Sequence, residues 1–165
     1  MSEDAGPLKS IVTPVRLEYD HSAGMATTGF LRGLKQKKIL GARSGPGQPV
    51  LVPPRGADPR TSELAAELVE VSDKGTIVTY SIVRVPSENI HFDLPYVCVN
   101  VLLDGASIGF FHVMQNCPLD QVRIGMRVRA HWAPDDQLSE NVSSIQYFEP
   151  IDEPDVPFER LREHT

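Results

Sequence analysis

The sequence has no apolar stretch near 18 residues long, no signal-peptide pattern and only two cysteines, Cys98 and Cys117. The first two absences argue against a membrane-spanning segment and a secreted chain, so we expect a soluble cytoplasmic protein without membrane contact. Two cysteines do not form a disulfide framework, and Cys98 lies in an apolar run typical of a core position. The chain also lacks an excess of positive charge, since 16 basic side chains stand against 22 acidic ones and the net charge is -6. A general nucleic-acid binder needs a basic surface to neutralise phosphates, so we expect no nucleic-acid partner.

Recognisable catalytic motifs are absent too. The chain has no Gly-x-Ser-x-Gly, no His-Glu-x-x-His and no phosphate-binding Gly-Lys-Ser/Thr loop. His91 and Asp93 form a candidate loop pair, for which a surface position is the simpler interpretation. We expect His112 to be a hydrogen-bonded barrel residue and His131 a solvated or interface residue, and nothing places a base near Cys117. We therefore assign no catalytic residue and do not expect the chain to be an enzyme by itself.

What the sequence does contain is a dense run of short strand patterns between Glu67 and Ala133. Residues 126–132 alternate apolar and polar side chains, and residues 75–83 are rich in β-branched and aromatic side chains. Residues 96–103 and 106–113 flank Asp104-Gly105, a dipeptide that tolerates the positive φ of a tight hairpin turn. Residues 143–149 supply a closing strand. Short strands without long helices between them predict a mainly β protein with a five-stranded OB-type barrel over residues 63–150.

The segments on either side of the barrel differ in charge. Residues 27–43 show a broken apolar stripe at helical spacing, and residues 29–60 carry seven basic side chains against one acidic, a net of about +6. Residues 133–165 carry nine acidic side chains against two basic, and we interpret residues 151–165 as an acidic tail that stays solvated or lies on a partner. Residues 1–26 form an N-terminal arm. Its apolar alternation at residues 11–19 fits either a disordered arm or an extended segment that pairs with a partner.

The basic segment has three interpretations: a solvated helix face, a site for an anionic ligand, or a surface for an acidic partner. Arg and Lys side chains grip phosphates through charge-assisted hydrogen bonds, so a CoA moiety is one candidate anion. The candidate anion-binding residues are Lys35, Lys37, Lys38, Arg43 and Arg55. A lone amphipathic helix needs a surface on which to bury its apolar stripe. We therefore expect Phe30, Leu31 and Leu34 to contact a partner.

The order of these parts resembles the family that pairs a rubredoxin-like zinc ribbon with an acyl-CoA-associated OB-fold domain. The resemblance spans about residues 27–149, with residues 27–62 as helix and ribbon. The matching pieces are Phe30-Leu31-Arg32-Gly33-Leu34, Val52-Pro53-Pro54-Arg55, Leu68-Val69-Glu70-Val71-Ser72-Asp73-Lys74-Gly75-Thr76-Ile77, Leu94-Pro95-Tyr96-Val97 and Val122-Arg123-Ile124-Gly125-Met126. Each piece is weak alone, and their order and spacing together are more specific.

The sequence departs from this family at the zinc knuckles. Members with a working ribbon carry two Cys-x-x-Cys pairs, and the corresponding positions here are Ser44, Gly47, Asp58 and Thr61. A structural zinc site needs four thiolate or imidazole ligands, so we expect a degenerate ribbon without metal.

The resemblance implies an accessory role. Such proteins form hetero-oligomers with thiolase-superfamily enzymes, including sterol-carrier-protein-type thiolases and retro-aldolases, or with hot-dog-fold enoyl-CoA hydratases. We expect a non-catalytic subunit of such a lyase or acyltransferase complex, in steroid or fatty-acid side-chain breakdown, with no bound cofactor and with acyl-CoA as a ligand of the complex. The alternative is an OB-fold nucleic-acid-binding module in which bases stack on Tyr80, Phe110 or Phe111.

Overall fold

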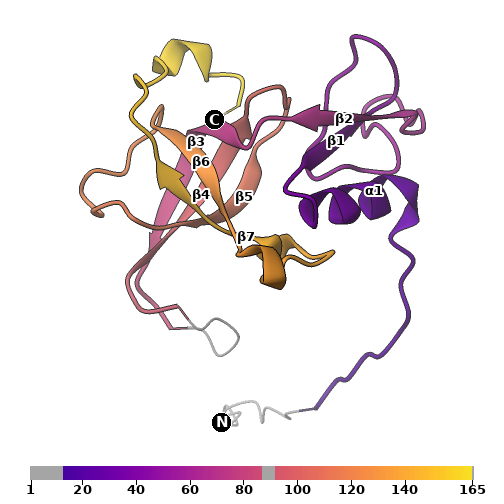
Figure 1. Ribbon diagram of the computed structural model, residues 1–165, viewed down its shortest axis with the longest axis horizontal. Coiled ribbons are helices and arrows are strands. Elements are labelled where there is room, and N and C mark those ends of the chain that lie inside the picture. The colour runs from indigo at the N-terminus through magenta and orange to yellow at the C-terminus, as the bar shows by residue number, and fades with distance from the viewer. Residues whose placement is uncertain (1–12, 87–91, 165) are drawn as a thin grey trace, which may run out of the picture.

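The computed structural model describes residues 13–86 and 92–164, and its largest part is a closed barrel of five strands (Figure 1). Around the barrel the strands follow the order β3-β4-β5-β7-β6. Their bounds are β3 Lys74–Val83, β4 Tyr96–Leu103, β5 Phe110–Met114, β6 Arg127–Trp132 and β7 Ile145–Pro150. All neighbours are antiparallel except β5 and β7, which are parallel. The predicted OB-type barrel, with a strand near residues 143–149 closing it, is confirmed.

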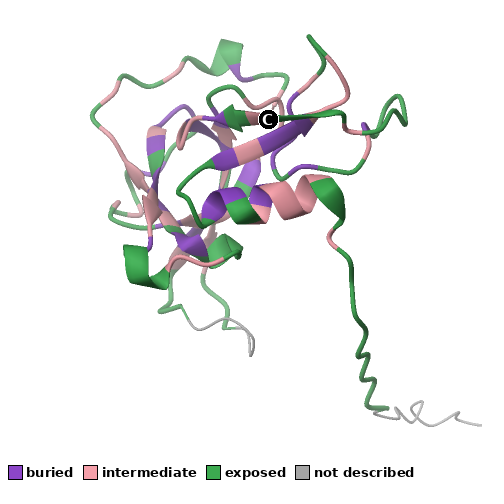
Figure 2. Ribbon diagram, turned by 45° about the vertical axis from the view of Figure 1, so that its right-hand side comes forward, coloured by how far each residue is buried: buried purple, intermediate pink, exposed green. Residues whose placement is uncertain are grey.

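The barrel closes around inward-facing apolar side chains, which alternate most regularly along β4 and β6. Burial alternates along the whole of β4, and Val128 and Ala130 are the buried positions of β6. Phe110 and Phe148 meet edge to face at 6.2 Å in the interior. Figure 2 shows buried positions in the barrel strands and at the end of the helix nearest the barrel.

The second part is a helix packed on a small sheet. Helix α1 spans Gly24–Leu34, and strands β1 (Ile39–Arg43) and β2 (Glu67–Val71) form an antiparallel pair outside the barrel. The predicted helix over residues 27–43 is therefore wrong in its last part, which is strand β1. Lys37 stops the helix by adopting a left-handed backbone with φ 56°, and the Lys38 N–H donates to the Gly33 carbonyl at 3.0 Å.

The apolar stripe of α1 is covered by this chain itself. Phe30 and Leu34 are buried in one continuous core shared by the helix, the ribbon segment and the barrel, and Leu31 packs against it. The Phe30 ring meets the edge of Phe110 at 6.4 Å. The prediction that these positions contact a partner is corrected for Phe30 and Leu34, because the barrel provides the surface that the stripe needs.

The connection from β4 to β5 is longer than a two-residue hairpin. Gly105 has φ 96°, as predicted for the Asp104-Gly105 turn, and the Ala106 N–H donates to the Leu103 carbonyl at 2.9 Å. Strand β5 nevertheless begins only at Phe110, because Ser107 is engaged with the ribbon segment. The Ser107 N–H donates to the Val50 carbonyl at 2.8 Å, and the Ser107 hydroxyl accepts from the Val50 N–H at 3.0 Å. This loop therefore fastens the ribbon segment to the barrel.

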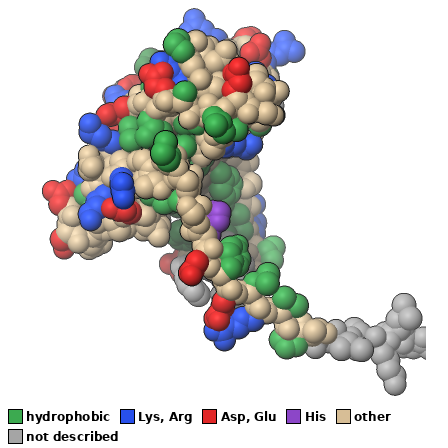
Figure 3. Space-filling view, turned by 90° about the vertical axis from the view of Figure 1, so that its right-hand side faces the viewer, with side chains coloured by type: hydrophobic (Ala, Val, Ile, Leu, Met, Phe, Trp, Pro, Cys, Tyr) green, Lys and Arg blue, Asp and Glu red, His purple; other side chains and the backbone are tan. Residues whose placement is uncertain are grey.

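The two ends of the chain leave the core differently. Residues 13–23 run as an extended arm away from the body of the molecule, as Figures 1 and 3 show. Residues 151–164 turn back over the end of the barrel. The expectation of a free acidic tail is corrected in part, because Glu153 and Val156 bond to the rest of the chain. Most described residues of the segment nevertheless stay exposed, and its contact with a partner stays a prediction.

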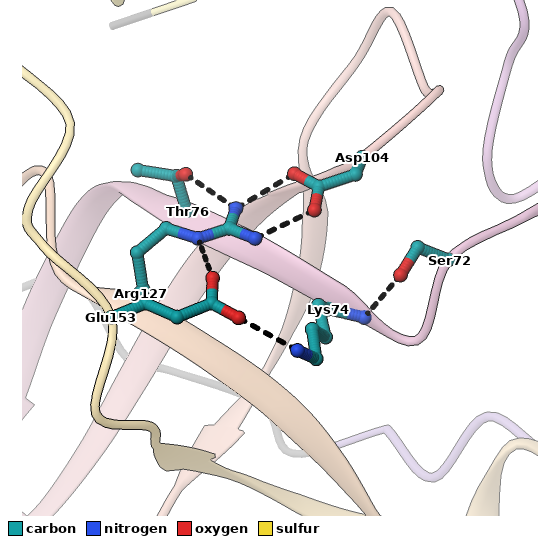
Figure 4. A network of polar contacts seen from close by, with 6 residues as sticks. All are labelled: Ser72, Lys74, Thr76, Asp104, Arg127 and Glu153. Carbon is teal, nitrogen blue, oxygen red and sulfur yellow. Dashed lines mark hydrogen bonds and ion pairs between the residues drawn. The ribbon is translucent and has the colours of Figure 1, made fainter.

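An ion-pair network fastens this C-terminal segment (Figure 4). The Arg127 guanidinium donates two hydrogen bonds to the Asp104 carboxylate, at 2.7 and 2.6 Å, and one to Glu153 at 2.9 Å. Lys74 Nζ donates to the other Glu153 oxygen at 2.6 Å. Lys74 and Arg127 lower the pKa of Glu153 by hydrogen bonding and charge. The Val156 N–H also donates to the Gly125 carbonyl at 2.9 Å, and Leu161 is buried.

Candidate interaction surfaces

The predicted anion-binding residues do not form one open basic site. Lys37 lies 2.6 Å from Asp135 and Lys38 lies 3.1 Å from Glu70. Arg43 donates to Glu67 at 2.8 Å, and this hydrogen bond lowers the pKa of the Glu67 carboxyl. Three of the five candidates are therefore neutralised by carboxylates of this chain.

Lys35 and Arg55 differ from those three. Both are exposed, and within residues 13–86 and 92–164 the structure shows no carboxylate paired with either. They remain the candidates for an anionic ligand.

The knuckle positions hold a turn together through hydrogen bonds. The buried Asp58 carboxylate accepts from the N–H groups of Arg60, at 2.8 Å, and Thr61, at 3.4 Å. Gly47 lies in an open turn with φ 76°. Ser44 Oγ is buried without a hydrogen-bond partner in the described structure. Two hydroxyls, a glycine and one carboxylate engaged in a turn do not fit a zinc ion. No group of three or more His, Cys, Asp or Glu side chains suited to a metal occurs in the described part of the chain.

An apolar groove lies at the seam between β5 and β7. These strands pair at one position, Met114 with Phe148, so the barrel wall is thin there. The groove has a volume of about 590 Å³ and is largely open to solvent. Its lining includes Phe92, Phe111, His112, Val142, Ile145 and Tyr147. Phe111 is 68% exposed. An exposed aromatic side chain beside an open apolar groove marks a surface that suits a ligand or a partner chain.

The sequence predicts one exposed aromatic side chain of this groove but not the groove itself. Phe111 was named as a candidate stacking surface, and it is exposed on β5 together with Tyr80 on β3. Phe110, named for the same role, is buried in the core and cannot stack with a base. The groove itself depends on the parallel seam between β5 and β7, which the order of residues does not reveal.

The histidines and cysteines do not assemble into a catalytic group within the described residues. Burial lowers the pKa of His112, which stacks at 5.9 Å on Phe110, and its Nδ1 has no hydrogen-bond partner there. The expected hydrogen bonding of His112 is thus incomplete. Burial raises the pKa of the Cys117 thiol, which keeps it protonated and a poor nucleophile. His91 lies outside the described residues, and Asp93 is exposed.

His131 belongs to a small polar cluster on the outside of β6 and β7. Its ring stacks on Tyr147 at 4.4 Å, and its Nδ1 lies 3.6 Å from Glu149. Asn116 donates to Glu149 at 2.9 Å and, with His131 and Arg129, lowers the pKa of that carboxyl. The cluster ties the β5–β6 connection to β7, and its partners are all side chains of this chain. None of the described helices is long and apolar enough to cross a membrane.

Residues 68–133 match a known family. Its description is "ChsH2, C-terminal OB-fold domain", and the match covers strands β3 to β6 and all of β2 except its first residue. The match spans less than half of the chain. No curated protein sequence matches this chain.

Two solved structures share the fold well beyond this domain. One is described as "Ltp2-ChsH2(DUF35) aldolase", with a TM-score of 0.59 and 20% identity over 82% of this chain and 98% of that one. The other is a protein of unknown function from the DUF35 family of Sulfolobus solfataricus. It has a TM-score of 0.58 and 19% identity over 78% of this chain and 87% of that one. Each of the two matches covers more residues of this chain than the barrel contains, so the likeness extends into the helix and ribbon segment. At this identity the likeness shows the fold.

Proposed function

We propose that this chain is a non-catalytic accessory subunit of a hetero-oligomeric acyl-CoA enzyme of the thiolase superfamily. The observation that carries the proposal is that this chain covers 98% of a chain in a solved structure described as an Ltp2-ChsH2(DUF35) aldolase. The family match to a ChsH2 OB-fold domain over residues 68–133 supports it independently.

The described surface is consistent with a supporting role. Within residues 13–86 and 92–164, burial raises the pKa of both cysteine thiols, and His131 is engaged with Tyr147 and Glu149, so none of these three side chains forms a nucleophile–base pair. Large apolar side chains are exposed in several places, as expected for a subunit that buries surface against another protein. In the proposed complex, the partner cleaves a carbon–carbon bond by an aldol- or Claisen-type reaction, and this chain supports the fold of the partner and the acyl-CoA site. Steroid or fatty-acid side-chain breakdown is the metabolic setting that we propose.

Co-expression tests the proposal directly. The full chain is expressed with the thiolase-like protein encoded nearest to it, and the mixture is analysed by size-exclusion chromatography with light scattering and metal analysis. We expect one peak that contains both proteins and no stoichiometric zinc. Separate peaks contradict the partner assignment, and stoichiometric zinc contradicts the degenerate ribbon. Co-elution with a hot-dog-fold hydratase instead of the thiolase-like protein changes the class of partner.

The contribution to acyl-CoA binding is tested with two matched double variants of the complex. Lys35→Ala/Arg55→Ala removes the two unpaired candidates, whereas Lys37→Ala/Lys38→Ala removes two side chains already paired with Asp135 and Glu70. We expect the first double variant to raise KM for acyl-CoA about tenfold at unchanged kcat, because it removes charge-assisted contacts to phosphate. We expect the second to change KM less than about threefold. Equal effects of both double variants exclude the assignment of Lys35 and Arg55.

A further inference from the structure

The N-terminal arm carries an apolar face that nothing in the described structure covers. Val15, Leu17 and Tyr19 are 81, 80 and 78% exposed, and they alternate with Arg16, Glu18 and Asp20. Arg16 and Glu18 form an ion pair beside this face. Alternation with period two places the three apolar side chains on one side of an extended segment. Such a segment is an unpaired amphipathic strand.

The apolar face continues onto the body of the molecule. The arm leads directly into α1, whose first turn presents Met25 with 90% of its surface exposed. Leu64, just before β2, and Leu68, within β2, are 77 and 43% exposed. Met25, Ala26 and residues 65–68 line a shared apolar hollow of about 300 Å³. Figure 3 shows hydrophobic side chains gathered on this side of the molecule and along the arm.

Strand β2 has an open edge close to this hollow in the sequence, since the hollow is lined by residues 65–68. The small sheet has the order β1-β2, so one edge of β2 has no strand beside it in the described structure. An unpaired edge presents N–H and C=O groups that a further strand can pair with. We call the surface made by residues 13–25 and 64–68 the arm surface.

The size of the arm surface fits a protein partner. Full burial of a large apolar side chain stabilises by about 1.5–3 kcal/mol, and each Å² of buried apolar surface contributes roughly 25 cal/mol. One such side chain therefore has about 60–120 Å² of apolar surface to bury. The six side chains of the arm surface are 43–90% exposed. Weighted by these fractions they offer about 270–540 Å², between a third and two-thirds of the roughly 800 Å² that one partner contributes to a standard interface. A small ligand would leave most of this surface in water.

We infer that the arm surface is the docking site for the catalytic subunit, and that the arm adds to that subunit as an extended strand. This inference rests on the proposed function and specifies where the partner binds. The complementary chemistry on the partner is an apolar groove beside an unpaired strand edge. A second copy of this chain is a poorer fit, because two chains of net charge -6 repel each other.

The test compares two sets of exposed apolar side chains in the full chain. Val15→Ser/Leu17→Ser/Tyr19→Ser removes the apolar face of the arm, and Phe111→Ser removes an equally exposed aromatic side chain from the β5–β7 groove. Binding of each variant to the catalytic subunit is measured by titration calorimetry, and thermal unfolding verifies that each variant is folded. We expect the triple variant to raise Kd at least about 30-fold and Phe111→Ser to change it less than about threefold.

Hydrogen exchange gives a second measurement that needs no substitution. We expect complex formation to protect the backbone amides of residues 13–23 and 64–68. A strand that pairs along one edge donates the N–H of every second residue to its neighbour. We therefore expect every second amide of residues 13–23 to become slow to exchange.

Each contrary outcome has a separate meaning. If the wild-type chain binds but the triple variant binds equally well, the interface lies elsewhere and the inference is wrong. If Phe111→Ser alone loses binding, the β5–β7 groove is the interface. If the chain alone is a dimer that the triple variant converts to a monomer, the arm pairs with a second copy. If the wild-type chain does not bind the thiolase-like protein at all, the proposed function fails and this partner assignment fails with it.

Discussion

Residues 13–23 and residues 151–164 are both terminal segments with charged side chains and proline, and the fold treats them in opposite ways. In the C-terminal segment, Glu153 pairs with Lys74 and Arg127, and Asp155 pairs with Arg123. Leu161 is buried. In the arm, by contrast, the large apolar side chains are about four-fifths exposed.

This contrast shows that charge alone does not reveal which terminus meets a partner. The acidic excess of residues 133–165 is taken up partly by cations of the barrel, and part of the basic excess of residues 29–60 is taken up by carboxylates of β2 and of residue 135. Exposed apolar side chains are the more informative feature, because water solvates a charge well and an apolar side chain poorly. On this criterion the arm, with three apolar side chains 78–81% exposed, lacks a partner more clearly than the acidic segment, whose one exposed large apolar side chain among the described residues, Phe158, is 51% exposed.

Deleting each segment in turn gives the largest expected difference. We expect removal of residues 151–165 to lower the free energy of unfolding by about 3–5 kcal/mol, from lost burial of Leu161 and from leaving Arg127 with fewer partners. Removal of residues 1–22 is expected to change it by less than about 0.5 kcal/mol. Urea unfolding of both deletion variants measures the difference. Equal losses of stability would mean that the arm is as well packed as the C-terminal segment.

The barrel could be predicted from the sequence because its strands carry local patterns. The alternation of residues 126–132 became β6, and the β-branched residues 75–83 lie within β3. The end of the helix could not be predicted, because residues 35–38 suit a helix by propensity. Strand β1 forms by pairing with β2. The first residue of β2, Glu67, lies 28 residues after the first residue of β1, Ile39. Such non-local pairing leaves no signal near Ile39.

The candidate interaction surfaces were only partly predictable for a similar reason. The spacing of Phe30 and Leu34 predicts an apolar stripe on the helix. The sequence does not show that the barrel covers this stripe. The alternation of the arm is visible in the sequence, whereas its exposure is a property of the fold. The ion pairs of Glu153 join residues 26 and 79 positions apart, so they could not be read from local charge runs.

Gly125 provides a sharper probe of how the C-terminal segment is held. It has φ 93°, and a Cβ at this position would lie 2.5 Å from the Val156 carbonyl oxygen. We expect Gly125→Ala to lower the free energy of unfolding by about 2–4 kcal/mol, from left-handed strain and from displacement of the segment.

Gly47→Ala is the matched control for this substitution. Gly47 also has a positive φ, of 76°, but a Cβ there meets nothing within 4 Å. We expect a loss of about 1–2 kcal/mol from strain alone. Urea unfolding of both variants isolates the contact with Val156, and equal losses would show that this contact contributes nothing.

Arg127 and Arg123 test whether burial decides the strength of the pairing. Each pairs with a carboxylate of the C-terminal segment, but the Arg127 side chain is 11% exposed and the Arg123 side chain 53%. We expect Arg127→Ala to lower the free energy of unfolding by about 2 kcal/mol, because Asp104 and Glu153 both lose a charged donor. Arg123→Ala is expected to have a much smaller effect, since an exposed pair is screened by water. A larger loss of stability for Arg123→Ala than for Arg127→Ala would show that burial does not decide how much these ion pairs stabilise the fold.

The smallest expected effect is the pH dependence of the Glu153 pairs. The hydrogen bonds and charges of Lys74 and Arg127 lower the pKa of Glu153 below its ordinary value of 4.5. A carboxyl whose pKa is lower in the folded state stabilises the fold above the ordinary pKa, and this contribution disappears as the pH falls through the lowered value. We therefore expect the wild type to be more stable than Glu153→Gln at pH 7, and the gap to close in acid. Urea unfolding at a series of pH values below 7 measures this gap. A gap that stays constant into acid would show that Glu153 acts through packing, and that the charges do not hold the C-terminal segment.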